Sequence, residues 1–172
     1  MAEVENSPTA VTTQIEHGRG VMESHILRLH PGQEIKSTLE QYVKENDLKA
    51  AFIITAVGSV TKATLRFAHD FKTGINEIRT FHRHLEILSL VGTLNDGSHL
   101  HISLSDKEGR FGNVIGGHVM GDLIVFTTCE VVIGNTVGLT VHRPFDKATG
   151  FPELAVVSCC DGGTKATQIK QS

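Results

Sequence analysis

The chain has 172 residues, 40% of them hydrophobic, and a formal net charge of −3 with neutral histidines. This length allows one domain with a substantial core, and the composition argues against wholesale disorder. The small acidic surplus argues mildly against a nucleic-acid-binding protein, which usually carries a basic surplus, and leaves a local basic patch open.

The cysteines and the N-terminus favour a cytoplasmic setting. Cys129, Cys159 and Cys160 are odd in number and irregularly spaced, unlike the cysteines of a disulfide framework. The first residues lack the basic start and apolar core of a secretory signal. No apolar run approaches the roughly 20 residues that a membrane helix needs. We therefore expect a cytoplasmic protein with no membrane partner.

The N-terminal region begins with a polar segment over residues 1–12, which is expected to be a flexible tail. A strand is predicted over residues 21–29, and Pro31-Gly32 ends it. The spacing then becomes helical, because four apolar residues recur at i, i+4, i+7 and i+8. The apolar face is Ile35, Leu39, Tyr42 and Val43, and the polar side is Glu34, Lys36, Glu40, Gln41 and Lys44. This is the one convincing helix, and it is expected to end near Asn46.

The remaining sequence is a series of predicted strands. They cover residues 50–57, 63–67, 77–81, 85–94, 99–105, 123–133 and 137–141. The first is a continuous apolar run, which is typical of a central strand buried on both faces. Gly134-Asn135 is predicted to turn the chain before the last strand. One helix followed by many strands predicts an α+β domain with a largely antiparallel sheet.

Three histidines give the sharpest chemical signal. Asn95-Asp96-Gly97 predicts a hairpin turn, and in the strand after it His99 and His101 share one face. His118 follows Gly116-Gly117, where two glycines allow close backbone approach or a sharp turn. Three neutral imidazoles with an open position suit Zn²⁺, and Ni²⁺, Co²⁺ or Fe²⁺ would also tolerate them. The sequence therefore predicts a metal site at His99, His101 and His118.

Alternatives to this interpretation stay open at the level of sequence. The three histidines also fit solvated or hydrogen-bonded surface residues, and His69 is a spare candidate ligand. Glu86 and Glu130 are candidate proton carriers or hydrogen-bond partners of the imidazoles. They also fit ordinary ion pairs or strand ends. By simple alternation Glu86 is expected on the same face as Leu88, Leu90 and Leu94, among apolar residues.

Four separated motifs resemble the PPC domain, the plant and prokaryote conserved domain. They are Gly58-Ser59-Val60, residues 85–92, His99-Leu100-His101, and residues 116–121. The resemblance implies a compact single domain over residues 13–145, with one main helix and a strongly bent antiparallel sheet. It leaves residues 146–172 as a partly flexible C-terminal extension. It also implies a homotrimer and a metal, typically zinc, bound by His99, His101 and His118.

The family fold is similar to acetolactate decarboxylase and to a zinc-dependent ester hydrolase. This similarity favours a metal-dependent hydrolase or lyase acting on a small carbonyl substrate, with Glu86 and Glu130 as catalytic candidates. In plants the domain follows AT hooks, which centre on Arg-Gly-Arg-Pro. Residues 17–20 read His-Gly-Arg-Gly and lack the second arginine and the proline, so the chain looks like the stand-alone form. The alternative is a non-enzymatic trimeric module for protein interaction or DNA-associated regulation.

Overall fold

The structure, a computed structural model, describes residues 15–68, 75–107 and 112–158. Within these ranges the chain forms one α-helix and nine strands. Their bounds are β1 Val21–Leu29, α1 Ile35–Glu45, β2 Ala51–Arg66, β3 Ile78–Thr93, β4 His99–Asp106, β5 Asn113–Val137, β6 Leu139–His142, β7 Phe145–Asp146, β8 Phe151–Pro152 and β9 Ala155–Ser158.

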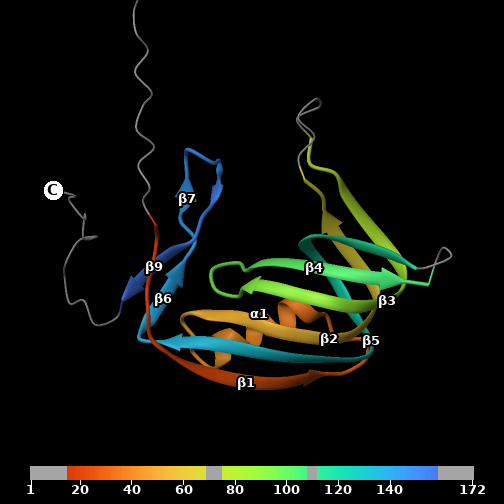
Figure 1. The fold of residues 1–172 in the computed structure, drawn as a ribbon, viewed down its shortest axis with the longest axis horizontal. Coiled ribbons are helices and arrows are strands. Elements are labelled where there is room, and N and C mark those ends of the chain that lie inside the picture. Colours follow the sequence, from red (N-terminus) through yellow and green to blue (C-terminus); the bar gives the residue numbers. More distant parts are fainter. Residues whose placement is uncertain (1–14, 69–74, 108–111, 159–172) are drawn as a thin grey trace, which may run out of the picture.

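The main sheet is antiparallel, with the strand order β1-β5-β2-β3-β4. The long strand β5 also pairs with β4 through its first residues, so the sheet curls back on itself. Figure 1 shows this curvature, with α1 packed on the curled sheet. The prediction of one helix with a bent, largely antiparallel sheet is confirmed for the described residues.

The helix packs into the sheet through the apolar spacing seen in the sequence. Ile35 and Leu39 are fully buried, Val43 is nearly so, and Tyr42 is half-buried. They join one core cluster with Leu100 and other inward-facing strand residues. The helix ends at Glu45 with Asn46 as its C-cap, as predicted.

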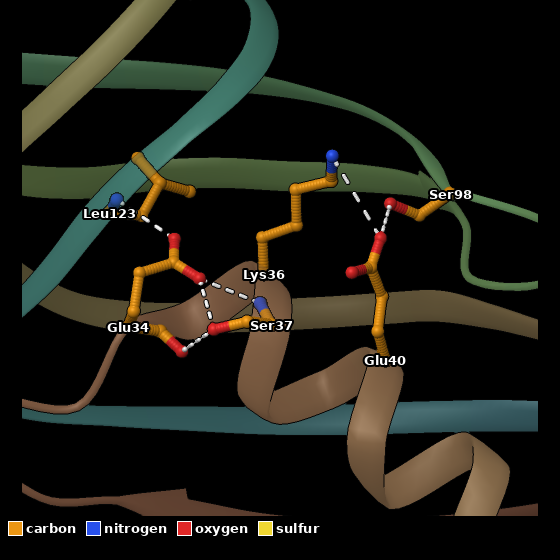
Figure 2. A network of polar contacts seen from close by, with 6 residues as sticks. All are labelled: Glu34, Lys36, Ser37, Glu40, Ser98 and Leu123. Carbon is orange, nitrogen blue, oxygen red and sulfur yellow. Dashed lines mark hydrogen bonds and ion pairs between the residues drawn. The ribbon is translucent and has the colours of Figure 1, made fainter.

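The polar side of α1 holds neighbouring segments, because two of its carboxylates accept hydrogen bonds from β5 and from the residue before β4 (Figure 2). Glu34 is the N-cap residue and accepts a hydrogen bond from the Ser37 N–H at 2.6 Å. Its other carboxylate oxygen accepts from the Leu123 N–H of β5 at 3.0 Å. Glu40 accepts from the Ser98 hydroxyl at 2.6 Å. The helix therefore fixes the residue that precedes His99.

Replacing Glu34 with alanine is expected to destabilise the fold. The change removes the N-cap and leaves the Leu123 N–H without its acceptor, so we expect a loss of about 1–3 kcal/mol in the free energy of unfolding. Urea denaturation would measure it. Glu45→Ala, at the exposed last turn of α1, is the matched control and should change stability by at most about 0.5 kcal/mol.

Several predicted strands merge into longer bent strands. Of the predicted ranges, residues 51–57 and 63–66 both lie in β2, and residues 78–81 and 85–93 both lie in β3. Register shifts along β2 let these strands bend without ending. The prediction that residues 50–57 lie in a central strand is confirmed by the strand order. This strand is not buried on both faces in the described structure, since the side chains of Ile54 and Val57 are 41% and 53% exposed.

The predicted turn at Gly134-Asn135 is wrong. Both residues lie inside β5, and the chain turns at Gly138, whose φ is +82°. Gly134 is needed within the strand because a Cβ there would lie 2.6 Å from the Phe52 ring. The Asn135 side chain accepts a hydrogen bond from the Ala50 N–H at 3.0 Å. Two turn-forming residue types therefore serve strand packing here.

The predicted facing of Glu86 is also wrong. The register of β3 against β4 shifts between Ile87 and Ser89, which leaves Leu88 at a bulge. A bulge adds one residue and reverses the alternation of side chains beyond it. Glu86 is therefore exposed on the face opposite Leu90 and Leu94, which are buried.

Beyond the main sheet the chain forms two short ribbons. β6 pairs with β9, and β7 pairs with β8. In Figure 1 these ribbons stand above the left part of the main sheet, and the far ends of β2 and β3 rise at its right as a separate projection. Part of the predicted C-terminal extension thus has regular structure, whereas its residues 159–172 and the predicted tail over residues 1–12 lie outside the described ranges. Within the described residues, no helix is long and apolar enough to cross a membrane.

Candidate metal centre

Strands β4 and β5 bring the three predicted histidines together. His101 lies directly opposite His118 in the antiparallel register. Nε2 of His99 lies 3.1 Å from Nε2 of His101, and the three rings have centroids 5.0–5.3 Å apart. One potential ligand atom from each residue lies within 4.8 Å of the other two. Zinc–nitrogen bonds of about 2.1 Å would place such atoms about 3.4 Å apart, so small ring rotations would suit one ion.

The two glycines before His118 allow the close strand approach that this site needs. A Cβ on Gly116 would lie 2.7 Å from the Ile102 carbonyl oxygen of β4. A Cβ on Gly117 would lie 2.8 Å from the Arg66 carbonyl oxygen of β2. Side chains at these positions would push β5 away from both neighbours. Of the two roles expected for the Gly-Gly pair, close backbone approach is therefore the one found, and it places His118 beside β4.

The side chains present fit a metal ion. Nδ1 of His118 is buried and has no hydrogen-bond partner among the described residues. An unpartnered buried imidazole nitrogen is uncommon and needs an explanation such as a missing ion. His101 is exposed on the outer face of β4, which gives an ion access from solvent. The donor set is three imidazoles, the set that zinc binds with one position open.

The electrostatic surroundings keep two of these imidazoles neutral. Burial lowers the pKa of His118 to about 4, with the Arg66 charge as the next cause. Burial also lowers the pKa of His99, followed by the charge of Arg143. Metal binding requires the unprotonated imidazole. Both residues are therefore in their metal-binding form at neutral pH.

These lowered pKa values predict a pH dependence of stability in the metal-free protein. Below about pH 6.5 the unfolded chain takes up protons on His99 and His118, whereas folded His118 does so only near pH 4. Because the unfolded state then binds more protons, the free energy of unfolding should fall as the pH drops through this window. Urea denaturation of wild type and His118→Asn at a series of pH values would measure it. An equally steep fall in the variant would contradict this assignment.

The other candidates from the sequence do not join the cluster. Glu86 lies opposite Ser105, four residues and roughly 13 Å along β4 from His101. Glu130 is exposed and lies opposite Val57, in the part of β5 that pairs with β1 and β2. Their roles as proton carriers stay predictions. His69 lies outside the described residues.

Two arginines near the site were missed by the sequence reasoning. Nη2 of Arg143 lies 3.0 Å from Nδ1 of His99. Arg66 is the cross-strand partner of His118. The sequence offered little signal for either, because Arg143 approaches only after the chain has turned through β6. For Arg66, the alternation of residues 63–67 gave its face but not its neighbouring strand.

The fold agrees with comparisons to known proteins. Residues 16–137 match the Plants and Prokaryotes Conserved (PCC) domain, which is the PPC domain named above. The chain belongs to this family. A hypothetical protein from Salmonella cholerae-suis has a TM-score of 0.72 at 37% identity, covering 83% of this chain and 98% of that chain. A metal-containing protein from Archaeoglobus fulgidus has a TM-score of 0.68 at 26% identity, covering 81% and 97%.

Curated relatives carry the domain within longer proteins. Bifunctional protein GlmU of Synechococcus sp. (strain JA-3-3Ab) is 38% identical over 138 residues, or 80% of this chain and 21% of that protein. AT-hook motif nuclear-localized protein 2 of Arabidopsis thaliana is 31% identical over 125 residues, or 67% of this chain and 35% of that protein. The chain thus spans about a fifth to a third of the length of these relatives.

Proposed function

We propose that this PPC protein binds zinc, assembles as a homotrimer and acts on a small carbonyl compound. The observation that carries the proposal is the convergence of His99, His101 and His118, with ligand atoms within 4.8 Å of one another. The similar protein from Archaeoglobus fulgidus is described as metal-containing, which supports the same use of the site here.

The donor set favours a catalytic over a closed structural ion. His99, His101 and His118 would hold the metal and leave a position for substrate or water. Zinc in such a site supplies Lewis-acid polarisation of a carbonyl group. Ni²⁺, Co²⁺ or Fe²⁺ would suit the same imidazoles. The fold similarity to acetolactate decarboxylase, expected from the family resemblance, favours a hydrolase or a lyase.

A small pocket beside His101 supports a small substrate. Its volume is about 190 Å³, below the range typical of drug-sized ligands. Its lining includes Ser89 and Ser103, and serine hydroxyl groups can donate hydrogen bonds to a carbonyl oxygen. Gly116 and Gly117 form another part of its wall. These groups suit a compound of few heavy atoms.

Exposed apolar residues on the outer face of the sheet support self-association. Val57, Leu88 and Val91 are 53%, 54% and 49% exposed. Val91 lies directly opposite His101, so apolar surface reaches the histidine cluster. Exposed apolar residues gathered on one face are typical of an interaction site. A homotrimer would cover this face close to the proposed metal.

A non-enzymatic regulatory module is the second candidate. It is favoured by the similarity to an Arabidopsis thaliana AT-hook nuclear-localized protein. The histidine cluster also contains no carboxylate among the described residues, so no proton carrier lies within it. In this function the domain serves assembly and partner contacts, and metal removal leaves partner binding unchanged.

Elemental analysis of the purified protein, combined with its molar mass from light scattering, tests the first candidate. We expect about one zinc per chain and three chains per particle. Metal-free protein that still forms a trimer would overturn the metal assignment and favour the regulatory module. A zinc-loaded monomer would overturn the assembly.

A further inference from the structure

Arg143 connects the C-terminal ribbons to the histidine cluster. Its Nη2 group donates to Nδ1 of His99 at 3.0 Å and to the Pro152 carbonyl oxygen at 2.8 Å. Its backbone N–H donates to the Asp96 carboxylate at 3.1 Å, in the turn before β4. The Arg143 guanidinium is therefore held at the edge of the site by two separate parts of the chain, β4 through His99 and β8 through Pro152. Arg143 lies beyond residue 137, where the match to the family ends.

Arg66 approaches the same histidines from the end of β2. Its guanidinium carbon lies 5.7 Å from the centroid of the Phe151 ring, in β8. Its charge contributes to the lowered pKa of both His118 and His99. The end of β2 and the ribbon that carries Phe151 are separate projections in Figure 1. One arginine thus comes from each projection.

The site carries a surplus of positive charge. Among the described residues, neither Arg66 nor Arg143 forms an ion pair with a carboxylate. Lys36, whose charge also reaches His118, is paired with Glu40 at 3.8 Å. Glu153 is an acidic residue near His99, and its charge acts to raise the pKa of His99. Three neutral imidazoles carry no charge that would offset the two positive charges of a divalent metal, so the bound ion would add to this surplus.

The contact between Arg143 and His99 suits the metal-free protein and not a protein in which His99 binds an ion through Nε2. Arginine is a hydrogen-bond donor without acceptor atoms, so Nδ1 of His99 accepts in this contact and the ring proton lies on Nε2. Nε2 of His99 faces Nε2 of His101, where a metal ligand atom must be unprotonated. A neutral His99 that binds metal through Nε2 carries its proton on Nδ1. Arg143 would then lose its acceptor and be free to bind another group.

We propose that Arg66 and Arg143 form an oxyanion subsite beside the histidines, so that the ligand of this site carries a carboxylate or phosphate group. A guanidinium matches either group with two parallel hydrogen bonds. The inference rests on the proposed metal site and adds the charge of its ligand. Because Arg143 and Phe151 follow residue 137, the subsite depends on residues outside the family match.

Titration calorimetry on zinc-loaded protein tests the subsite. The probes are pyruvate, inorganic phosphate and the uncharged methyl pyruvate. We expect one or both anions to bind wild type and methyl pyruvate to bind much more weakly. The affinity should fall about 10- to 100-fold in Arg143→Gln and in Arg66→Gln. Arg28→Gln, which removes an exposed arginine of β1, is the control of equal charge and should leave the affinity unchanged.

Zinc content, measured before and after each titration, separates this inference from the metal proposal. Full zinc content with equal anion affinity in wild type, Arg66→Gln and Arg143→Gln would overturn the subsite alone, and so would no anion binding by zinc-loaded wild type. If wild type holds no zinc, the metal proposal fails. The same titrations on the metal-free protein then decide the subsite, and equal affinities of wild type and Arg66→Gln overturn it.

Discussion

The His101→Ala variant is expected to lose bound zinc almost completely. Removal of outer hydrogen-bond partners alone typically costs metal sites about 10- to 100-fold in affinity, so loss of one of three ligands should cost more than about 100-fold. His101 is exposed, and its replacement should change the stability of the metal-free fold by at most about 0.5 kcal/mol. Elemental analysis and a zinc titration would measure the loss.

The His82→Ala variant is the matched control, because His82 is an exposed histidine of β3. It should retain wild-type zinc content. Thermal unfolding gives a second readout, since zinc stabilises only a folded protein that binds it. Added zinc should therefore raise the Tm of wild type and of His82→Ala but not of His101→Ala. Full zinc content in His101→Ala would remove His101 from the site.

Leu90→Ala and Leu88→Ala are expected to differ strongly in stability, although the two leucines are neighbours at i and i+2 in β3. Leu90 is 1% exposed, and its truncation should cost about 2–5 kcal/mol in the free energy of unfolding. Leu88 is 54% exposed at the bulge, and its truncation should cost at most about 0.5 kcal/mol. An unbroken alternation would place both residues on one face.

Urea denaturation at a fixed protein concentration would measure both variants, with molar mass recorded alongside. Fixed concentration matters because the stability of an oligomer depends on it. Equal costs for the two variants with unchanged molar mass would mean that Leu88 also lies in the core, and the bulge would be wrong. A change of molar mass in Leu88→Ala alone would instead place Leu88 in the subunit interface.

Local patterns in the sequence predicted the parts of the fold that depend on near neighbours. The spacing of Ile35, Leu39 and Val43 predicted α1, because residues three and four apart share one face of a helix. The turn at Asn95-Asp96-Gly97 predicted the β3–β4 hairpin, confirmed by the antiparallel register. Predictions failed where distant strands decide the local geometry. Gly134 suits a turn by residue type, yet in β5 it makes room for the ring of Phe52.

The sequence by itself determined that His99 and His101 share one face of a strand, because side chains alternate with a period of two. It also showed two glycines before His118. Only the tertiary structure decided that His118 lies opposite His101, since this follows from the curl that pairs the start of β5 with β4. The same curl, together with the turn through β6, decided that Arg143 reaches His99. Contacts between residues so far apart depend on strand register and bulges, which simple alternation does not reveal.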